Sequence, residues 1–224
     1  MRRFHVASLD LPIVLSREAT HHMLHVLRFV PNDTFVLFDG LGLQCEATLR
    51  SVDDGVVKIE LIGHPQRVPA VRQSHLLIGL PKHASMDRAL RMASEIGITD
   101  VHPFIAKRSA AKGDRMKRWE GITAASTAQC GRSDTVRLHP AASLHEHIQS
   151  LPADTLRFIA LPGAERRASP TGQNPRAIVI GPEGGLADTE VSTCLQADFK
   201  PVGLAQFTLR TDTAVALATR WLTQ

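Results

Sequence analysis

The stretch IVIGPEGGLADTE, residues 178–190, decides how this chain is interpreted. Its apolar start runs directly into Gly181-Pro182-Glu183-Gly184-Gly185, and a helix-like segment follows. Gly and Pro are the usual residues of a tight strand-to-helix connection. A glycine loop also lets a ligand approach bare backbone, because no Cβ stands in the way. The stretch alone leaves both interpretations open.

After about residue 74 the chain alternates between apolar strands and helices. Residues 75–80, 156–161 and 176–180 are nearly continuous apolar runs, which are typical of strands buried in a parallel sheet. Helical patterns cover residues 85–97, 114–131 with Asp114 as a candidate N-cap, 188–198 and 211–222. This alternation predicts an α/β fold with a mainly parallel sheet.

The first 70 residues are organised differently. Residues 35–40, 45–52 and 56–63 are short β-rich runs separated by Asp-Gly turns, which favour a small barrel or a curled sheet. One helix interrupts them at residues 16–30, with Ser16 as N-cap and Ala19, Met23, Val26 and Leu27 at helical spacing. The polar, Pro-containing join at residues 63–74 predicts two domains, residues 1–70 and 74–224.

Composition restricts the class of protein. The chain has 224 residues, of which 43% are hydrophobic, enough for a sizeable core. Its three cysteines lie far apart and fit neither a zinc ribbon nor a disulfide framework. The first residues lack the apolar stretch of a signal peptide, and no run approaches the roughly 20 apolar residues of a membrane span. We expect a soluble, cytoplasmic protein that does not associate with a membrane.

Basic residues are concentrated in parts of the chain. The formal net charge is +4, and clustered Lys and Arg are an electrostatic signature of nucleic-acid binding, although an ordinary solvated surface looks similar. The middle of the chain carries Lys107, Arg108, Lys112, Arg115, Lys117, Arg118 and Arg132. The chain has no Tyr, 8 Phe and 2 Trp, which disfavours a long aromatic platform for single strands.

Four predicted strands, the fourth of them within residues 199–205, end in Gly- or Pro-bearing loops, at residues 80–82, 161–163, 181–185 and 202–205. Open parallel sheets bind ligands at these carboxyl ends. Neither G-x-G-x-x-G nor the P-loop motif occurs, which argues against dinucleotides and nucleoside triphosphates. A cleft of backbone amides with few charges suits S-adenosylmethionine, which has a flat adenine and a sulfonium cation.

Several separate motifs carry a family resemblance. IGPEGG at 180–185 and LRTDTAVA at 209–216 resemble the RsmE family of SPOUT methyltransferases. Residues 21–28 and 38–42 resemble the N-terminal PUA-like domain of that family, and residues 80–109 and 128–132 its catalytic half. The family usually has Glu at Asp212, and Gly and Arg at Ala205 and Phe207.

The resemblance implies a trefoil-knotted α/β domain behind a PUA-like β-barrel, a homodimer, and methylation of N3 of one uridine in 16S ribosomal RNA of the small subunit. It implies S-adenosylmethionine as the methyl donor, bound by three loops in the knot. Two alternatives stay open: a SPOUT enzyme acting on transfer RNA, and an RNA-binding assembly factor that has lost activity.

The expected donor-binding residues belong to the three loops. They are Leu161, Pro162, Gly163, Ile180, Gly181, Pro182, Glu183, Gly184, Gly185, Val202, Leu204, Thr208, Leu209 and Arg210.

Three residues are candidates for catalysis. Arg210 precedes a helix and would stabilise charge on the uracil oxygens, or it braces the loop. Glu183 would accept a proton or hold the polar end of the donor, or it bonds backbone amides. Asp212 would act as a base, or it caps the helix.

The candidates for RNA contact are basic or polar residues from both predicted domains: Arg3, His22, Arg28, Lys82, Arg108, Gln129 and Arg132. Of these, Gln129 and Arg132 could face a dimer partner instead. His21 and His25 have the i, i+4 spacing of a zinc pair, but no suitable third ligand follows nearby, so we expect no metal.

Overall fold

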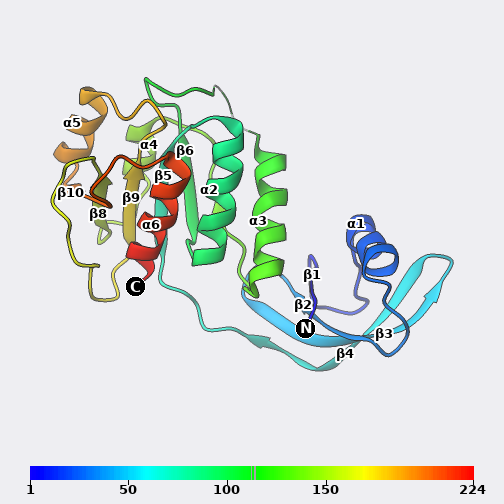
Figure 1. Ribbon diagram of the computed structural model, residues 1–224. Helices are drawn as coiled ribbons and strands as arrows, with labels where there is room; N and C mark the ends of the chain where they lie inside the picture. Colours follow the sequence, from blue (N-terminus) through cyan, green and yellow to red (C-terminus); the bar gives the residue numbers. More distant parts are fainter. Residues whose placement is uncertain (112, 114) are drawn as a thin grey trace. The chain divides into compact units, whose positions relative to one another are not determined.

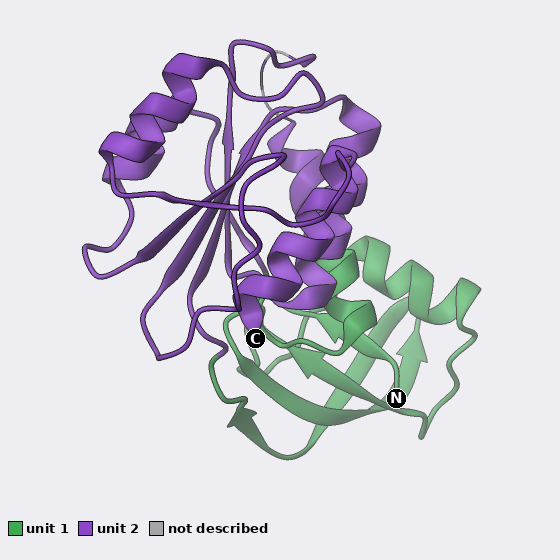
Figure 2. Cartoon of the chain, turned by 60° about the vertical axis from the view of Figure 1, so that its left-hand side comes forward, with its two compact units in different colours: residues 1–70, 124–135 green, residues 71–123, 136–224 purple. Residues whose placement is uncertain are grey.

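The computed structural model describes residues 1–111, 113 and 115–224, so the predicted N-cap Asp114 and the basic residue Lys112 lie outside the described residues (Figure 1). The chain forms two compact units (Figure 2). Unit 1 contains residues 1–70 and 124–135, and unit 2 contains residues 71–123 and 136–224. The second half of helix α3 (Met116–Cys130) and the loop after it therefore belong to unit 1, which the sequence pattern did not indicate.

Unit 1 is built on a four-stranded sheet in the order β1-β2-β3-β4. The strands are β1 (Arg3–His5), β2 (Thr34–Phe38), β3 (Leu43–Asp53) and β4 (Val56–Arg67). The three predicted strands are confirmed, whereas the short β1, which pairs parallel to β2, was not predicted. β4 also continues to Arg67, into the predicted join, because Pro65 is tolerated in a strand at the edge of a sheet.

The predicted helix at residues 16–30 is shorter and changes type. α1 (Arg17–His21) begins where Ser16 Oγ accepts the Ala19 N–H at 3.1 Å, which confirms the N-cap. A π-helix, η1 (His22–Val26), follows directly. Its wider turn shifts the apolar face: Met23 is fully buried, but Val26, which falls at the same predicted helical spacing, is 58% exposed.

Unit 2 is a six-stranded parallel sheet in the order β10-β8-β9-β5-β6-β7, which confirms the predicted parallel α/β architecture. Its strands are β5 (Ser74–Gly79), β6 (Asp100–Phe104), β7 (Arg137–Leu138), β8 (Leu156–Ala160), β9 (Arg176–Ile180) and β10 (Lys200–Val202). The other helices are α2 (His83–Ile96), α4 (Leu144–Gln149), α5 (Asp188–Gln196) and α6 (Thr211–Thr223). β7 and α4 were not predicted.

Helices cover both faces of this sheet. Side chains of α2 and α6, with Trp119 of α3, form one apolar core against the strands, and side chains of α4 and α5 form the other (Figure 1). The apolar face of α2 packs into this core, since Met86, Ala89, Leu90 and Ala93 are buried. Gly97, with φ of 114°, ends the helix. Within the described ranges, every helix is too short or too polar to span a bilayer.

The long connection 161–175 is fastened to the end of the chain. The buried Arg176 donates from Nη1 to the carbonyl oxygen of Leu222 at 2.5 Å, and from Nη2 to that of Gly172 at 3.3 Å. Trp221 Nε1 donates to the carbonyl oxygen of Arg167 at 2.9 Å. The last turn of α6 thus lies against the connection, as the predicted knot requires.

Helices α2 and α6 are joined by a charged pair. Arg88 Nε donates to Asp212 Oδ2 at 2.5 Å, and Asp212 Oδ1 accepts the Thr213 N–H at 3.0 Å. The hydrogen bond from Arg88 is the largest cause that lowers the pKa of Asp212 below its usual value of 3.8. A carboxylate whose pKa is lowered by folding stabilises the protein above its unfolded pKa, and this stabilisation is lost as the pH falls through the folded pKa.

We expect Asp212→Asn to lower the melting temperature at pH 7 by about 2–4 °C, the shift that 1 kcal/mol causes in a protein of this size. The difference from wild type should shrink below about pH 4, because the wild-type carboxyl then becomes neutral as well. The exposed Asp154, as Asp154→Asn, is the control that should change little. Thermal melts by circular dichroism across pH test this, and a difference independent of pH would contradict it.

Candidate functional site

A pocket of about 710 Å³, open to solvent, lies at the carboxyl ends of β8 and β9. The loop 204–209 and the first turns of α6 form the rest of its wall. The lining residues are Ala160, Leu161, Pro162, Ile180, Gly181, Pro182, Glu183, Gly185, Leu186, Leu204, Ala205, Phe207, Thr208, Leu209, Thr211 and Ala214.

Ten of the expected donor-binding residues line this pocket: Leu161, Pro162, Ile180, Gly181, Pro182, Glu183, Gly185, Leu204, Thr208 and Leu209. Four others, Gly163, Gly184, Val202 and Arg210, are not among the lining residues. Val202 is fully buried in the core because it lies within β10. The sequence pattern missed Thr211 and Ala214, since a helical pattern does not show that the first turns of α6 face a strand end.

The glycine loop at residues 181–185 serves both as a tight strand-to-helix connection and as bare backbone that faces a ligand. Gly181 and Gly185 line the pocket, so bare backbone faces the space where a ligand would lie. Gly184 lies against Arg108, where there is no room for a side chain. A Cβ at this position would lie 2.9 Å from Arg108 Cβ and 3.1 Å from the Arg108 carbonyl oxygen. The tight connection and the ligand wall are therefore made by different glycines.

Glu183 is the only ionisable side chain among the described residues that line the pocket. Its carboxylate accepts the backbone N–H of Lys82 at 3.1 Å and 3.3 Å. This contact fastens the glycine loop to the start of α2. It is the contact expected if Glu183 bonds backbone amides. The same contact places one negative charge at the edge of an otherwise uncharged wall.

The two other catalytic candidates lie outside the pocket wall. Asp212 is 7% exposed and is held by Arg88, so its position favours the structural alternative over the role of a base. Arg210 is the exposed N-cap residue of α6. Within the described part of the chain, no hydrogen bond or ion pair engages its guanidinium, which is thus available to a bound molecule.

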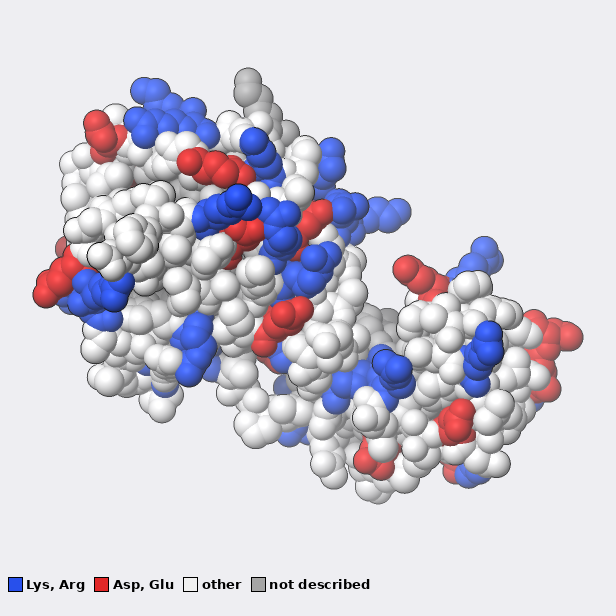
Figure 3. All heavy atoms as spheres, in the orientation of Figure 1, with Lys and Arg blue, Asp and Glu red and all other residues white. Residues whose placement is uncertain are grey.

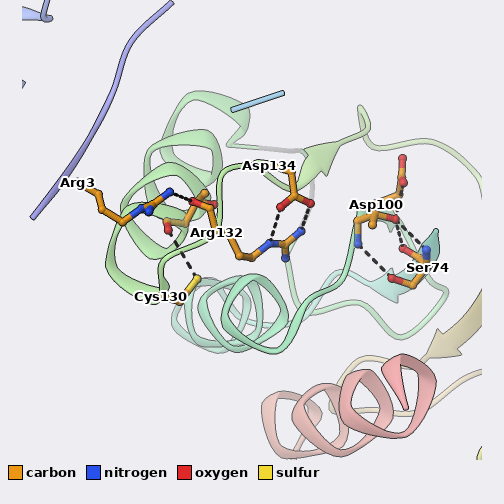
Figure 4. A network of polar contacts seen from close by, with 8 residues as sticks. Arg3, Ser74, Asp100, Cys130, Arg132 and Asp134 are labelled. Atoms are coloured by element: carbon orange, nitrogen blue, oxygen red, sulfur yellow. Dashed lines mark hydrogen bonds and ion pairs between the residues drawn. The ribbon is translucent and has the colours of Figure 1, made fainter. Parts of the chain in front are cut away.

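In unit 1, two of the residues expected to contact RNA have partners within the chain. Arg3 Nη2 donates to Gln44, to the Arg132 carbonyl oxygen and to Ser133 at 2.7–3.1 Å, and burial lowers its pKa. Arg132, whose side chain is 11% exposed, forms a two-point ion pair with Asp134 (Figure 4). Both guanidinium groups hold residues 132–134, so both already have partners within the chain, and their contact with RNA stays a prediction.

The remaining residues expected to contact RNA differ in their exposure and in their partners within the chain. His22, Arg28 and Gln129 are exposed in unit 1. In unit 2, Lys82 is exposed, whereas Arg108 Nη1 donates to the carbonyl oxygens of Gly184 and Leu186 at 3.3 Å and 3.4 Å. Arg108 thus braces the glycine loop.

The basic middle of the chain is partly neutralised. Figure 3 shows Lys and Arg side chains over α2 and the first half of α3, with Asp and Glu among them. Arg118 contacts Asp87 through two nitrogens, as near as 2.6 Å. Lys107, Arg115 and Lys117 stay exposed, so a basic surface remains in unit 2, with fewer free charges than the sequence suggested.

Comparison with known proteins gives matches over almost the whole chain. The model of an RNA methyltransferase domain matches residues 69–223, and that of an RNA methyltransferase PUA domain matches residues 15–62. The chain is 26% identical to ribosomal RNA small subunit methyltransferase E of Synechocystis, over 94% of this chain and 72% of the relative. It is also 26% identical to the protein of that name in Bacillus subtilis, over 89% and 85%.

Solved structures agree with this assignment. The ribosomal RNA small subunit methyltransferase E of Neisseria gonorrhoeae, bound to S-adenosyl methionine, superimposes with a TM-score of 0.87 at 26% identity, covering 98% of this chain and 95% of that one. A methyltransferase of Legionella pneumophila in complex with the same cofactor gives a TM-score of 0.85 at 25% identity, with the same coverage. The predicted fold class, a SPOUT domain with a PUA-like domain, is confirmed, and the chain belongs to the RNA methyltransferase family.

Proposed function

We propose that this protein transfers a methyl group from S-adenosylmethionine to N3 of a uridine in the ribosomal RNA of the small subunit. The observation that carries the proposal is the pocket at the carboxyl ends of β8 and β9, whose wall is apolar and has a single carboxylate. The names of the similar enzymes support the same RNA class.

The pocket residues fit the methyl donor. Leu161, Ile180 and Leu204 offer apolar contact to a flat ring, and the glycine loop exposes backbone at the same edge. No Lys or Arg lines the described wall, so nothing there repels a sulfonium cation, and Glu183 attracts it. When bound, S-adenosylmethionine supplies an electrophilic methyl group.

The protein has to position a uracil opposite that methyl group and favour loss of its N3 proton. Positioning two bound partners contributes a large part of such a rate enhancement. As N3 loses its proton, negative charge spreads onto the uracil oxygens. The free guanidinium of Arg210, at the positive N-terminus of α6, is the group we assign to that charge.

Phe207 is the second residue that we assign to the base. Its side chain lines the pocket, yet 78% of its surface is exposed, which is unusual for a large apolar residue. Proteins that read unpaired RNA stack splayed-out bases on such aromatic side chains. We place the face of the target uracil on Phe207, where the family usually has Arg.

We also propose that the protein acts as a homodimer, on the strength of the family resemblance. Phe207 lines the pocket and is exposed, and the exposed Arg210 lies between the lining residues Leu209 and Thr211, so a second chain could complete the site. Light scattering that gave the mass of a single chain with full activity would contradict this part of the proposal.

Filling the pocket should abolish donor binding. Ala205 lines the wall and is half-buried. We expect Ala205→Trp to weaken S-adenosylmethionine binding at least tenfold in calorimetry, with an unchanged melting temperature. The control is Ala153→Trp, at an exposed position before β8. Wild-type affinity in a folded Ala205→Trp variant would show that the donor binds elsewhere.

Arg210→Ala should lower the single-turnover rate of methyl transfer to small-subunit ribosomal RNA by on the order of 10² to 10³, as when one donor to a developing charge is removed. Donor affinity should change little, because the contact strengthens mainly in the transition state. Arg210→Lys should recover part of the rate. Higher pH should partly rescue the Ala variant, since more uridine is then deprotonated. Joint loss of donor affinity and melting temperature would instead show that Arg210 only braces the loop.

Phe207→Ala should weaken the use of RNA by about tenfold in kcat/KM, since stacking of one base contributes roughly 1–3 kcal/mol. The donor Kd should stay within about twofold, and Phe207→Trp should retain activity because it keeps a stacking face. Leu195→Ala, which removes another exposed apolar side chain, is the control. Equal kcat/KM for Phe207→Ala and wild type would remove Phe207 from the base site.

A further inference from the structure

A second cluster of reactive side chains lies at the opposite edge of the parallel sheet in unit 2. His75 is in β5, and Asp100 and His102 are in β6. All three are at least 97% buried, with exposures of 3%, 3% and 2%. They sit at the amino ends of their strands, whereas the pocket lies at carboxyl ends, so the cluster does not belong to the methyl-transfer site.

Strand register brings these residues together. His75 pairs directly with Asp100 in the β5–β6 ladder. Asp100 and His102 are two residues apart in one strand, so both side chains point to the same face. Their ligand atoms all lie within 4.8 Å of one another. Two imidazoles and one carboxylate are a common ligand set for divalent transition metals.

The hydrogen bonding inside the cluster is incomplete. His75 Nδ1 and His102 Nε2 lie 3.0 Å apart and share one proton. The outer nitrogens, His75 Nε2 and His102 Nδ1, are buried and have no partner among the described residues. Whichever tautomers are chosen, one buried N–H and one buried lone pair are left over. Buried polar groups without partners are rare, and bound water is a usual partner for them. An ion between the two facing nitrogens would leave both outer nitrogens as N–H donors, so these outer atoms do not by themselves point to an ion.

We propose that His75, Asp100 and His102 bind one divalent transition-metal ion, of which Zn²⁺ is the best fit. The facing nitrogens of the two histidines are 3.0 Å apart. Two nitrogens bound to Zn²⁺ in tetrahedral geometry are about 3.3 Å apart, so a small opening of the pair admits the ion.

The surroundings of the three ligands are also polar. Thr99 Oγ1 donates to Asp100 Oδ2 at 2.8 Å and accepts the Ser74 N–H at 2.8 Å, which joins the first residues of β5 and β6. His139 Nε2 bonds Asp100 Oδ1 at 2.9 Å, and its ring stacks on His102 at 3.9 Å. Such partners fix the orientation of metal ligands in known sites.

Two further groups limit how the ion can enter. The His147 ring lies against His102, but its Nε2 donates to the Pro103 carbonyl oxygen at 2.8 Å and is not free to bind. Arg137 Nη1 is 3.5 Å from Asp100 Oδ1 and opposes a cation, yet its side chain is 72% exposed and can turn away. The His139 side chain is 30% exposed, so it forms the side of the cluster that faces solvent. It is also a candidate fourth ligand.

The role we assign to the ion is structural. It would join the amino ends of β5 and β6 and leave methyl transfer unchanged. A ligand that binds only the folded state raises the melting temperature as its concentration increases. The proposal therefore has a readout that does not involve the enzyme activity.

The test uses the purified full chain, stripped of metal by a chelator. We expect Co²⁺ to bind at one equivalent with the visible absorption of a tetrahedral site, Zn²⁺ to displace it, and Zn²⁺ to raise the melting temperature. His75→Asn, Asp100→Asn and His102→Asn should each abolish the absorption and the shift in melting temperature. Each should also lower the affinity for the metal at least tenfold. The exposed pair His21 and His25, whose rings are 4.7 Å apart, is the control for adventitious binding, and a His21→Ala/His25→Ala variant should behave as wild type.

Two results would overturn the proposal. One is the absence of Co²⁺ absorption and of a melting shift in the folded wild-type protein. The other is binding that survives in folded cluster variants and disappears in the His21→Ala/His25→Ala variant, since the surface pair would then be the site. Circular dichroism of each metal-free variant establishes that it is folded, and Asp100→Asn, which preserves the shape of the side chain, serves if a histidine variant fails to fold.

Discussion

The close passage of Gly203 beneath residues 164 and 165 is the constraint on which the site depends. A Cβ at Gly203 would lie 2.1 Å from the Ala164 carbonyl oxygen, so no other residue fits without moving the backbone. The Gly203 N–H donates to the Glu165 carbonyl oxygen at 2.9 Å and fixes the crossing. Because the loop 204–209 begins directly after Gly203, this crossing sets the wall of the pocket and the position from which Phe207 and Arg210 extend.

The chemistry of unit 2 is distributed between the two edges of one sheet. At the carboxyl ends of β8 and β9, charges are few and the walls are apolar, which suits a flat cationic donor. At the amino ends of β5 and β6, histidines and a carboxylate gather in a buried cluster. The carboxylates nearest the pocket are occupied by structural contacts, Glu183 with the Lys82 N–H and Asp212 with Arg88. Positioning and the Arg210 charge are therefore the contributions to methyl transfer that we propose for this chain.

The sequence predicts features that depend on local patterns and misses those that depend on register and distant contacts. The apolar run 176–180, the face of α2 and most of the pocket wall follow from periodicity, glycine loops and family motifs. The exposure of Val26 could not be predicted because a π-helix changes the spacing. The sequence also does not show that Arg3 and Arg132 have partners within the chain, because Ser133 and Gln44 reach Arg3 only through the fold. His75 and Asp100 lie 25 residues apart and meet only through the β5–β6 ladder.

The central claim is tested most directly by mapping the modified nucleoside. The purified protein is incubated with S-adenosylmethionine and with RNA from a strain that lacks its gene, and the RNA is digested and analysed by mass spectrometry. The account predicts one new 3-methyluridine, in small-subunit ribosomal RNA, which disappears with Arg210→Ala at early times. A methyl group found in transfer RNA, or on an atom other than N3, would contradict it, as would a folded protein that binds no S-adenosylmethionine.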